Sequence, residues 1–359
     1  MNATPLIVMA AILAAISLIL SVARRLLVDY GECRIVINGK KTFRVKGGET
    51  LLSYFIANKI FIPSACGGKS TCGFCKTRVL TDVGDLLPTE AVFISQEEKA
   101  EGIRLACQVK VKKDIEVSFP EYLLGTKEYK TRVTSVESLT HDIKHLTLRM
   151  ETADRITFKP GQYVQFKVPG TEEFRAYSIA SSPSRGDEIE LIVRQVPGGL
   201  CTTYIHEILK AGATATITGP YGDFFLREDS TKDIICIGGG CGMAPGRSIL
   251  LSLAENGRRR KATYFFGARS KKDLFYTEEL RELERQYPNF RYVPALSEPK
   301  PTDQWDGEVG LITHVVEKHI ADAHNAEAYL CGPQPMIDAS LKVLSAKGME
   351  KDKILYDKF

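Results

Sequence analysis

Residues 66–75 of this chain read Cys66-Gly67-Gly68-Lys69-Ser70-Thr71-Cys72-Gly73-Phe74-Cys75, and a further cysteine, Cys107, follows at a distance. The four cysteines have the spacing C-x5-C-x2-C, followed by a long gap to the last. A zinc ribbon normally uses two short C-x2-C knuckles, so one long arm, one short arm and a distant fourth ligand fit a zinc site poorly.

The cysteine spacing lies close to the plant-type pattern of 2Fe-2S proteins, C-x4-C-x2-C with a distant fourth cysteine, with one residue added to the first gap. The three glycines of the loop favour such a site, because a loop wound round a cluster must bring backbone N–H groups close to sulfur. We therefore expect a 2Fe-2S cluster that passes electrons one at a time. Its metal ligands would be Cys66, Cys72, Cys75 and Cys107.

The residues around these cysteines predict a small α+β, β-grasp-like ferredoxin domain over residues 28–125. Two short β-prone runs, residues 34–37 and 42–45, are joined by Asn38-Gly39, which is a strong hairpin signal. Residues 49–58 have the apolar spacing of a helix, and residues 109–119 (VKVKKDIEVSF) alternate as a strand does.

The N-terminal segment has no charged side chain before Arg24 and Arg25, and residues 5–23 (PLIVMAAILAAISLILSVA) are apolar over nearly the length of a membrane-spanning helix. A cleaved signal peptide has its positive charge before the apolar run. The sequence therefore predicts an uncleaved, single-pass transmembrane anchor over residues 1–27 in the cytoplasmic (inner) membrane, with the soluble domains facing the cytoplasm. A buried hairpin helix of a soluble domain is the alternative.

The composition limits the class of protein. The chain has 359 residues, of which 44% are hydrophobic and 26% charged, with a formal net charge of +4. These values indicate a folded protein of several domains, and the scattered basic residues give no support for a nucleic-acid partner. Cysteines in a reducing compartment favour metal ligation over disulfides. Four of the nine are not expected to bind metal: Cys33, Cys201, Cys236 and Cys241.

From about residue 126 the pattern changes to short alternating strands, which predict an antiparallel β-barrel over residues 126–228. The run Arg175-Ala176-Tyr177-Ser178 lies within it. An arginine fork matches pyrophosphate oxygens and an aromatic face covers a flat ring. Four residues alone could fall on any barrel strand, but residues 197–204 (PGGLCTTY) open a helical pattern with glycines and small hydroxyls, as a phosphate cradle does.

Residues 233–237 (DIICI) form a buried strand pattern that runs into the glycine loop 238–245 (GGGCGMAP), and a helical pattern follows. Strand, glycine loop and helix in this order suit a dinucleotide pyrophosphate, since the backbone must approach the phosphates and the helix N-terminus must face them. We therefore expect an α/β nucleotide-binding domain with a parallel sheet over residues 229–359.

These motifs resemble the ferredoxin-NADP reductase superfamily. The resemblance rests on R-x-Y-S at 175–178, on GPYG at 219–222, on the glycine loop, and on the segments FGARS and CGPQPM at 266–270 and 331–336. It implies that Arg175 contacts the flavin phosphate, that Tyr177 packs on the isoalloxazine, and that Ser178 hydrogen-bonds near the flavin N5. It also implies that Cys331 lies against the nicotinamide, where a packed core thiol is the alternative, and that Phe359 stacks on the flavin, where an exposed chain end is the alternative.

From this resemblance we expect Ser178 and Cys331 to be the catalytic residues. The expected cofactor-binding residues are Gln162, Tyr163, Arg175, Tyr177, Ser178, Gly199, Cys201, Thr202, Gly240, Gly242, Met243, Pro245, Gly267, Arg269, Ser270, Gly332, Pro333 and Phe359.

The order of anchor, ferredoxin domain, flavin barrel and nucleotide domain resembles the family of F subunits of the sodium-translocating NADH:quinone oxidoreductases over nearly the whole chain. Segments such as GQYVQF, RAYSIA, FFGARSKKDLFY and ILYDKF carry this resemblance. It implies FAD rather than FMN, NADH rather than NADPH, and redox subunits in the membrane as partners. A nicotinamide gives up two electrons as a hydride whereas a 2Fe-2S cluster takes one, so a flavin between them would divide the pair.

Two other functions remain open on the sequence. A reductase component that feeds an oxygenase uses the same three modules, but such proteins are normally soluble. A membrane-tethered iron-sulfur carrier or sensor would bind the nucleotides without turnover. The basic stretch 269–272 could also accept the 2′-phosphate of NADPH, or it could be simple surface charge.

Overall fold

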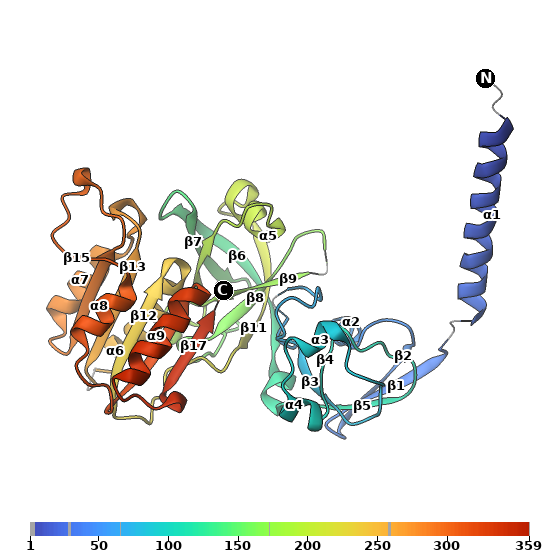
Figure 1. Cartoon of the computed structure of the whole chain (residues 1–359), viewed down its shortest axis with the longest axis horizontal. Coiled ribbons are helices and arrows are strands. Elements are labelled where there is room, and N and C mark those ends of the chain that lie inside the picture. The colour runs from blue at the N-terminus through green and yellow to red at the C-terminus, as the bar shows by residue number, and fades with distance from the viewer. Residues whose placement is uncertain (1–3, 28–29, 65, 172, 258–259, 359) are drawn as a thin grey trace. The chain divides into compact units, whose positions relative to one another are not determined.

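The computed structural model describes residues 4–27, 30–64, 66–171, 173–257 and 260–358. The chain divides into two compact units, Met1–Thr126 and Lys127–Phe359 (Figure 1). The predicted boundary between the flavin and nucleotide domains falls inside the second unit. The predicted domain boundaries at residues 27, 125 and 228 stay predictions.

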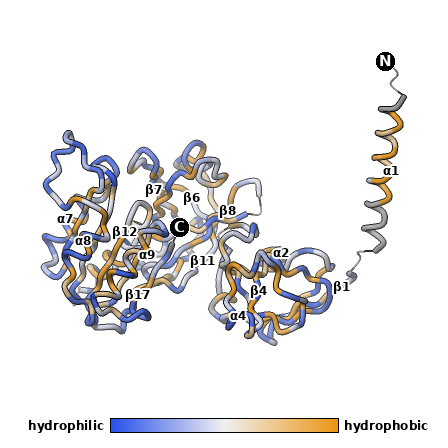
Figure 2. Tube along the Cα trace, viewed as in Figure 1, coloured by the Kyte–Doolittle hydropathy of each residue, from blue (hydrophilic) through white to orange (hydrophobic). Residues whose placement is uncertain are grey.

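The first unit begins with the helix α1 (Thr4–Leu27), whose middle part is hydrophobic (Figure 2). Large apolar side chains on it are exposed, among them Ile7, Leu13 and Leu18. Within the part of the chain that the structure describes, no helix is long and apolar enough to cross a membrane. The transmembrane anchor predicted over residues 1–27 is therefore not confirmed.

A five-stranded sheet with the order β2-β1-β5-β3-β4 forms the body of the first unit. The predicted hairpin is present, because Asn38 and Gly39 adopt the left-handed conformation that a tight turn between β1 and β2 requires (φ 52° and 64°). The predicted helix is α2, which Thr50 caps by accepting a hydrogen bond from the Ser53 N–H. The elements are β1 (Glu32–Ile37), β2 (Lys41–Lys46), α2 (Leu51–Ala57), β3 (Lys76–Val79), α3 (Pro88–Ala91), α4 (Gln96–Ala100), β4 (Ile103–Leu105), β5 (Ile115–Ser118) and the 3-10 helix η1 (Glu121–Gly125).

The prediction of a strand over residues 109–119 is wrong for the first half of that range, since only Ile115–Ser118 (β5) form a strand. The preceding residues bond to the segment before α2 instead: the Leu51 N–H donates to the Val109 carbonyl and the Val111 N–H to the Glu49 carbonyl, at 2.8 and 3.0 Å. Val109 and Val111 are both buried, so alternation correctly marks which side chains face the core. It does not show which backbone groups they pair with.

A buried ion pair fixes the segment that leads to Cys107. The Arg104 Nη2 atom lies 2.6 Å from Glu90 Oε2, and the Leu105 N–H donates to Glu90 Oε1 at 2.9 Å. Burial alone would raise the pKa of Glu90, but these hydrogen bonds outweigh it and hold the pKa below its ordinary value. The last predicted cluster ligand therefore follows a strand that is tied to α3.

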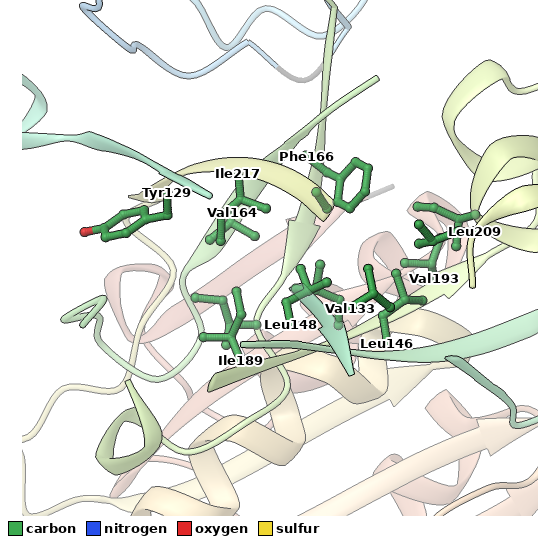
Figure 3. Packing of buried hydrophobic residues seen from close by; sticks show 14 of the residues in the cluster. Tyr129, Val133, Leu146, Leu148, Val164, Phe166, Ile189, Val193, Leu209 and Ile217 are labelled. Atoms are coloured by element: carbon green, nitrogen blue, oxygen red, sulfur yellow. The ribbon is translucent and has the colours of Figure 1, made fainter. Parts of the chain in front are cut away.

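The second unit contains a six-stranded antiparallel sheet with the order β10-β7-β6-β11-β8-β9. A further bridge between Ile179 and Leu191 brings the chain after β9 against β10 and closes the sheet into the predicted barrel. Figure 3 shows Val133, Leu148 and Phe166 among the apolar side chains gathered in its core. The strands are β6 (Lys127–Ser138), β7 (Ile143–Met150), β8 (Tyr163–Lys167), β9 (Phe174–Ser178), β10 (Glu188–Arg194) and β11 (Thr214–Tyr221), with the 3-10 helix η2 (Pro183–Arg185).

The helical pattern after residue 200 forms two short pieces rather than one helix. They are α5 (Leu200–Thr203) and the π-helical turn η3 (Tyr204–Ile208). The wider turn accommodates Ile205, which is fully buried in the barrel core.

The remainder of the second unit is a parallel sheet with the order β15-β14-β13-β12-β16-β17, as the sequence predicts. Because parallel strands end at the same edge, the loops after β12, β13 and β16 lie together. The strands are β12 (Asp233–Gly239), β13 (Ala262–Ala268), β14 (Phe290–Leu296), β15 (Glu308–Val309), β16 (Ala326–Gly332) and β17 (Ile354–Lys358). The helices are η4 (Gly240–Gly242), α6 (Met243–Glu255), η5 (Lys271–Asp273), α7 (Thr277–Gln286), η6 (Pro301–Asp303), α8 (Ile312–His319), α9 (Gln334–Ala346) and η7 (Lys351–Lys353).

Candidate functional site

The four cysteines predicted to bind the cluster lie together in the first unit, as two pairs of thiols. Cys66 and Cys72 are hydrogen-bond partners, and so are Cys75 and Cys107. Electrostatic interactions join Cys75 to Cys72 and Cys107 to Cys66, so the two pairs are neighbours. Hydrogen bonding lowers the pKa of one thiol in each pair, Cys66 and Cys107, and the thiolate is the form that binds iron.

This paired arrangement distinguishes between kinds of metal site. A structural zinc ion needs four ligands around one point. A 2Fe-2S cluster takes four cysteines, two on each of its irons. Two adjacent thiol pairs therefore fit the binuclear cluster.

The loop between Cys66 and Cys75 is shaped by left-handed residues. Gly67, Gly68 and Gly73 have φ values of 63°, 85° and 70°. A Cβ atom on Gly73 would lie 2.6 Å from the ring of Phe93, so a larger residue cannot stand there without movement. Polar hydrogens approach the sulfurs: the N–H of Phe74 donates to Cys72 Sγ at 3.5 Å, and the Ser70 hydroxyl lies 3.5 Å from Cys107 Sγ. Such contacts are what a cluster with negative sulfurs requires.

In the second unit, β9 carries the predicted flavin residues. Arg175 and Tyr177 project from the same face of the strand, because side chains alternate along it. The Arg175 guanidinium is mostly buried and pairs with Glu173, Nη2 to Oε2, at 2.5 Å. A guanidinium held this way offers a fork to an anion, which fits the predicted contact with a flavin phosphate.

The strand β9 lies beside the predicted phosphate cradle. The Tyr177 hydroxyl and the Cys201 thiol are hydrogen-bond partners, and burial raises the pKa of Tyr177. Thr202 is used in the turn itself, since its hydroxyl accepts from the Val196 N–H and donates to the Gly199 carbonyl, both at 3.1 Å. The structure therefore brings Arg175, Tyr177, Gly199, Cys201 and Thr202 into one region.

The two predicted residues at the start of β8 have different surroundings. The Gln162 amide bridges backbone groups, as Nε2 donates to the Gly222 carbonyl at 3.0 Å and Oε1 accepts from the Lys159 N–H at 2.9 Å. Tyr163 is partly exposed and stands opposite Ser178 in the pairing of β8 with β9. Phe359, predicted to stack on the flavin, lies outside the described residues.

A cavity of about 350 Å³ opens at the carboxyl edge of the parallel sheet. Four predicted nucleotide residues line it: Gly240, Gly267, Arg269 and Pro333. Ser270 is not among its lining residues, and its hydroxyl donates instead to Asp273 Oδ2 at 2.8 Å. The volume and the glycine-lined wall suit a nucleotide phosphate or ribose.

Other predicted nucleotide residues lie behind the cavity wall. Met243 is buried in the core at the start of α6, and Pro245 is buried within that helix. A Cβ atom on Gly242 would lie 1.8 Å from the Cys331 carbonyl oxygen, so glycine lets the loop approach β16 closely. Cys331 is 3% exposed, and burial raises the pKa of its thiol. Gly332, next to it, has a φ of 159°.

The barrel also contributes to this cavity, which the sequence motifs did not indicate. The lining residues that it supplies are His141, Asp142 and Arg194. Arg194 Nε lies 3.1 Å from Asp142 Oδ2. A Cβ atom on Gly240 would lie 2.9 Å from Arg194 Nη2, so the guanidinium lies directly on the glycine loop. Arg194 is the last residue of the strand EIELIVR, whose other residues are all buried, and a basic residue at the end of a buried strand is the signal that could have revealed it.

Comparison with protein families agrees with this geometry. A family described as "2Fe-2S iron-sulfur cluster binding domain" matches residues 35–112. Another, "Oxidoreductase FAD-binding domain", matches residues 130–226, and a third, "Oxidoreductase NAD-binding domain", matches residues 236–342. The cofactors of this chain are therefore a 2Fe-2S cluster, FAD and NADH, and the three predicted fold types are confirmed.

Two solved structures of similar fold are reductases. The Amycolatopsis cytochrome P450 reductase GcoB superposes with a TM-score of 0.73 at 30% identity, over 91% of this chain and 98% of that one. The ferredoxin reductase in carbazole 1,9a-dioxygenase gives a TM-score of 0.70 at 28% identity with the same coverage.

Sequence relatives cover almost the whole chain. The F subunit of the Na(+)-translocating NADH-quinone reductase of Neisseria meningitidis serogroup C is 37% identical over 97% of this chain and 96% of its own length. The proteins of the same name from Pseudomonas aeruginosa and Methylococcus capsulatus are 35% and 34% identical, each over 97% of this chain. With this identity over nearly its full length, the chain belongs to the family of F subunits of the Na(+)-translocating NADH-quinone reductases, and it is an NADH-oxidising flavo-iron-sulfur reductase.

Proposed function

We propose that this chain is the component through which electrons from NADH enter a sodium-translocating quinone reductase, and that it delivers them to redox subunits in the membrane. The observation that supports this most directly lies in the second unit. Asp142 and Arg194 of the flavin barrel line one cavity together with Gly240 of the nucleotide loop. A flavin over Tyr177 and a nicotinamide at that loop would then be neighbours, as hydride transfer requires.

The residue roles that we propose come from the family resemblance and, for Arg194, from its place beside the glycine loop. Arg175 would hold the flavin phosphate, Tyr177 would cover the flavin ring, and Ser178 would hydrogen-bond near its reactive nitrogen. Arg194, which lies on Gly240, would hold the pyrophosphate of NADH and would give up its contact with Asp142 when NADH binds. The bound FAD accepts electrons in a pair and releases them singly, so it connects the nicotinamide with the cluster.

Reduction of the flavin by NADH tests this function. Addition of NADH under anaerobic conditions to the purified chain with its cofactors bound is expected to bleach the flavin absorbance within seconds, since typical turnover numbers are about 10 per second. The electron paramagnetic resonance signal of a reduced 2Fe-2S cluster should follow. NADPH at the same concentration is the control and should act much more slowly. A flavin that stays oxidised would instead indicate a carrier or sensor without turnover.

Cys331 provides a test of the two roles open to it. If its thiol lies against the nicotinamide, Cys331→Ala should slow the limiting rate of flavin reduction about tenfold, the effect of roughly 1.4 kcal/mol on the barrier, without changing the dissociation constant of NADH. The matched control is Cys236→Ala, a buried thiol on the neighbouring strand β12. A rate equal to that of the control, with only a lower melting temperature, would show that Cys331 is a core residue.

We also propose that α1 attaches the chain to the cytoplasmic membrane as a single pass, with the domains in the cytoplasm. This proposal is supported by exposed apolar side chains such as Ile12 and Ile16, which are 53% and 48% exposed. Replacing both by arginine should release the chain from the membrane, because each charge costs about 3 kcal/mol at the centre of a bilayer helix. The control is the same substitution at Ile208, which is 62% exposed in the second unit. Carbonate-washed membranes that retain the double variant would contradict the proposal.

A further inference from the structure

Within the second unit, α6 is bound along its length to the chain segment 180–184 of the barrel. Arg247 Nη1 donates to the Ala180 carbonyl at 3.0 Å, and the buried Ser248 hydroxyl donates to the Ser181 carbonyl at 2.8 Å. Near the other end of the helix, Glu255 accepts hydrogen bonds from the hydroxyls of Ser182 and Ser184. The contacts span more than two turns of the helix, from residue 247 to residue 255.

The two connected segments are direct continuations of the two cofactor sites. Ala180 follows the flavin motif, two residues after Ser178, on the chain that leaves β9. The helix α6 starts immediately after Gly242, the last residue of η4 in the glycine loop 238–245. A shift of α6 along this segment would therefore move the nucleotide loop relative to the flavin strand.

Arg247 holds the largest set of these contacts. Its Nη1 atom lies 2.5 Å from Glu190 Oε2 on β10, and its Nε atom lies 2.8 Å from Glu279 Oε1 on α7. The guanidinium also stacks on the ring of Tyr276, 4.7 Å from its centroid. One side chain thus connects α6, α7 and two segments of the barrel.

The network is buried. The side chains of Arg247 and Glu190 are 11% and 9% exposed. His145 and Arg185 also face Glu190, with nitrogen atoms 3.5 and 3.2 Å from its carboxylate. Burial would raise the pKa of Glu190, but His145 and Arg247 hold it at about 2, so the carboxylate stays charged. Apolar residues of both parts also belong to one buried cluster, including Ala180 and Ile192 with Ile249 and Leu250.

A buried ionic network of this kind fixes the position of the helix α6 more than it stabilises the fold. A buried ion pair is often no more stabilising than apolar residues of the same volume, because desolvation offsets the attraction. Its geometry is nevertheless strict, since a fork that bonds two carboxylates and a carbonyl fits only one placement of the helix. Hydride transfer needs strict placement, as reacting atoms must approach to about 3–3.5 Å and a displacement of about 1 Å can slow a reaction about 100-fold.

We propose that Arg247 is a positioning residue for hydride transfer, which sets the nucleotide loop at Gly240–Gly242 in register with the flavin strand β9. This role rests on the proposed transfer from NADH to FAD. In that reaction the hydride leaves the nicotinamide with both electrons of its C–H bond, NADH becomes NAD⁺, and the flavin is reduced by two electrons. Arg247 touches neither reactant and acts through α6 and Ala180.

The test compares Arg247→Met with Arg260→Met in the full chain with its cofactors. Arg260 forms a matched ion pair with Glu327 at 2.6 Å, with 11% and 3% exposure, but it connects β16 only to the linker after the barrel. We expect Arg247→Met to lower the limiting rate of flavin reduction 10- to 100-fold and to raise the primary kinetic isotope effect with NADH deuterated at C4. The dissociation constant of NADH should change less than threefold. Arg260→Met should lose thermal stability and keep the wild-type limiting rate.

A second readout needs no turnover. In the FAD-free chain, Arg247→Met should increase amide hydrogen exchange in residues 179–185 and 238–243, whereas Arg260→Met should leave both segments protected. Arg247→Lys keeps the charge without the fork and should recover only part of the rate. If Arg247→Met does not fold, Ser248→Ala removes one contact and should still slow reduction severalfold.

Two outcomes separate the proposals. If NADH does not reduce the wild-type chain, the proposed function is wrong. If NADH reduces the wild-type chain normally and the variants at Arg247 and Ser248 have the same limiting rate of flavin reduction as Arg260→Met, only the positioning role is wrong.

Discussion

Replacing Cys107 by serine is expected to abolish the 2Fe-2S cluster while leaving the reduction of the flavin by NADH intact. Cys107 is buried and paired with Cys75, so its loss would leave one iron with a single thiolate partner. The Glu90 and Arg104 pair would still hold the preceding strand in place. Iron content and the visible absorption of the cluster should fall to the level of the apoprotein, and stopped-flow flavin reduction should stay within about twofold of wild type.

The matched control for this variant is Cys33→Ala. Cys33 is 1% exposed in the same sheet, and its thiol donates to the Tyr30 carbonyl at 3.7 Å. It should keep a full complement of iron. Cluster loss in the control, or an intact cluster in Cys107→Ser, would contradict the assignment of the four ligands.

Replacing Arg175 by alanine is expected to empty the FAD site. Hydrogen bonds to a charged group contribute about 1.5–3 kcal/mol each, so removal of the fork should weaken FAD binding about 10- to 100-fold. The variant also leaves Glu173 without the cation that neutralises it, which places an unpaired negative charge beside the phosphates. Titration of the FAD-free protein, followed by the quenching of flavin fluorescence, measures the change.

Arg132→Ala serves as the control for Arg175. Arg132 lies on β6 of the same barrel, is exposed, and pairs with Glu151 at 2.7 Å. Its removal should leave the dissociation constant of FAD within about a factor of two. An Arg175→Ala chain that retains FAD as firmly as this control would show that other groups hold the flavin phosphate.

The sequence predicted best those features that depend on local chemistry. The hairpin at Asn38-Gly39 and the start of α2 after Thr50 follow from turn and cap preferences that act over a few residues. The parallel sheet follows from a strand, a glycine loop and a helix in sequence. The four cysteines could be grouped because few kinds of metal site share their spacing.

Features that depend on long-range contacts were not predicted. Alternation of apolar residues marks Val109 and Val111 as buried, but the pairing with residues 49–51 is set by tertiary structure. The placement of Arg194 against Gly240 joins residues far apart in the chain, and no local pattern encodes it. Met243 and Pro245 belong to the loop motif, yet they form its packed underside, because a motif specifies the shape of a loop and not which side chains reach the ligand.

The division of the chain at residue 126 matches a difference between the two transfer steps. The first step transfers a hydride, and the second transfers single electrons. A hydride includes a nucleus, which moves only between groups that touch. The folds that hold its donor and acceptor accordingly share an apolar cluster, to which Ala180, Ile192 and Leu250 belong. A single electron is transferred without a nucleus, so its donor and acceptor need not touch. The iron-sulfur fold can therefore have a core of its own, and selection can adapt it to a new electron acceptor without disturbing the chemistry of NADH.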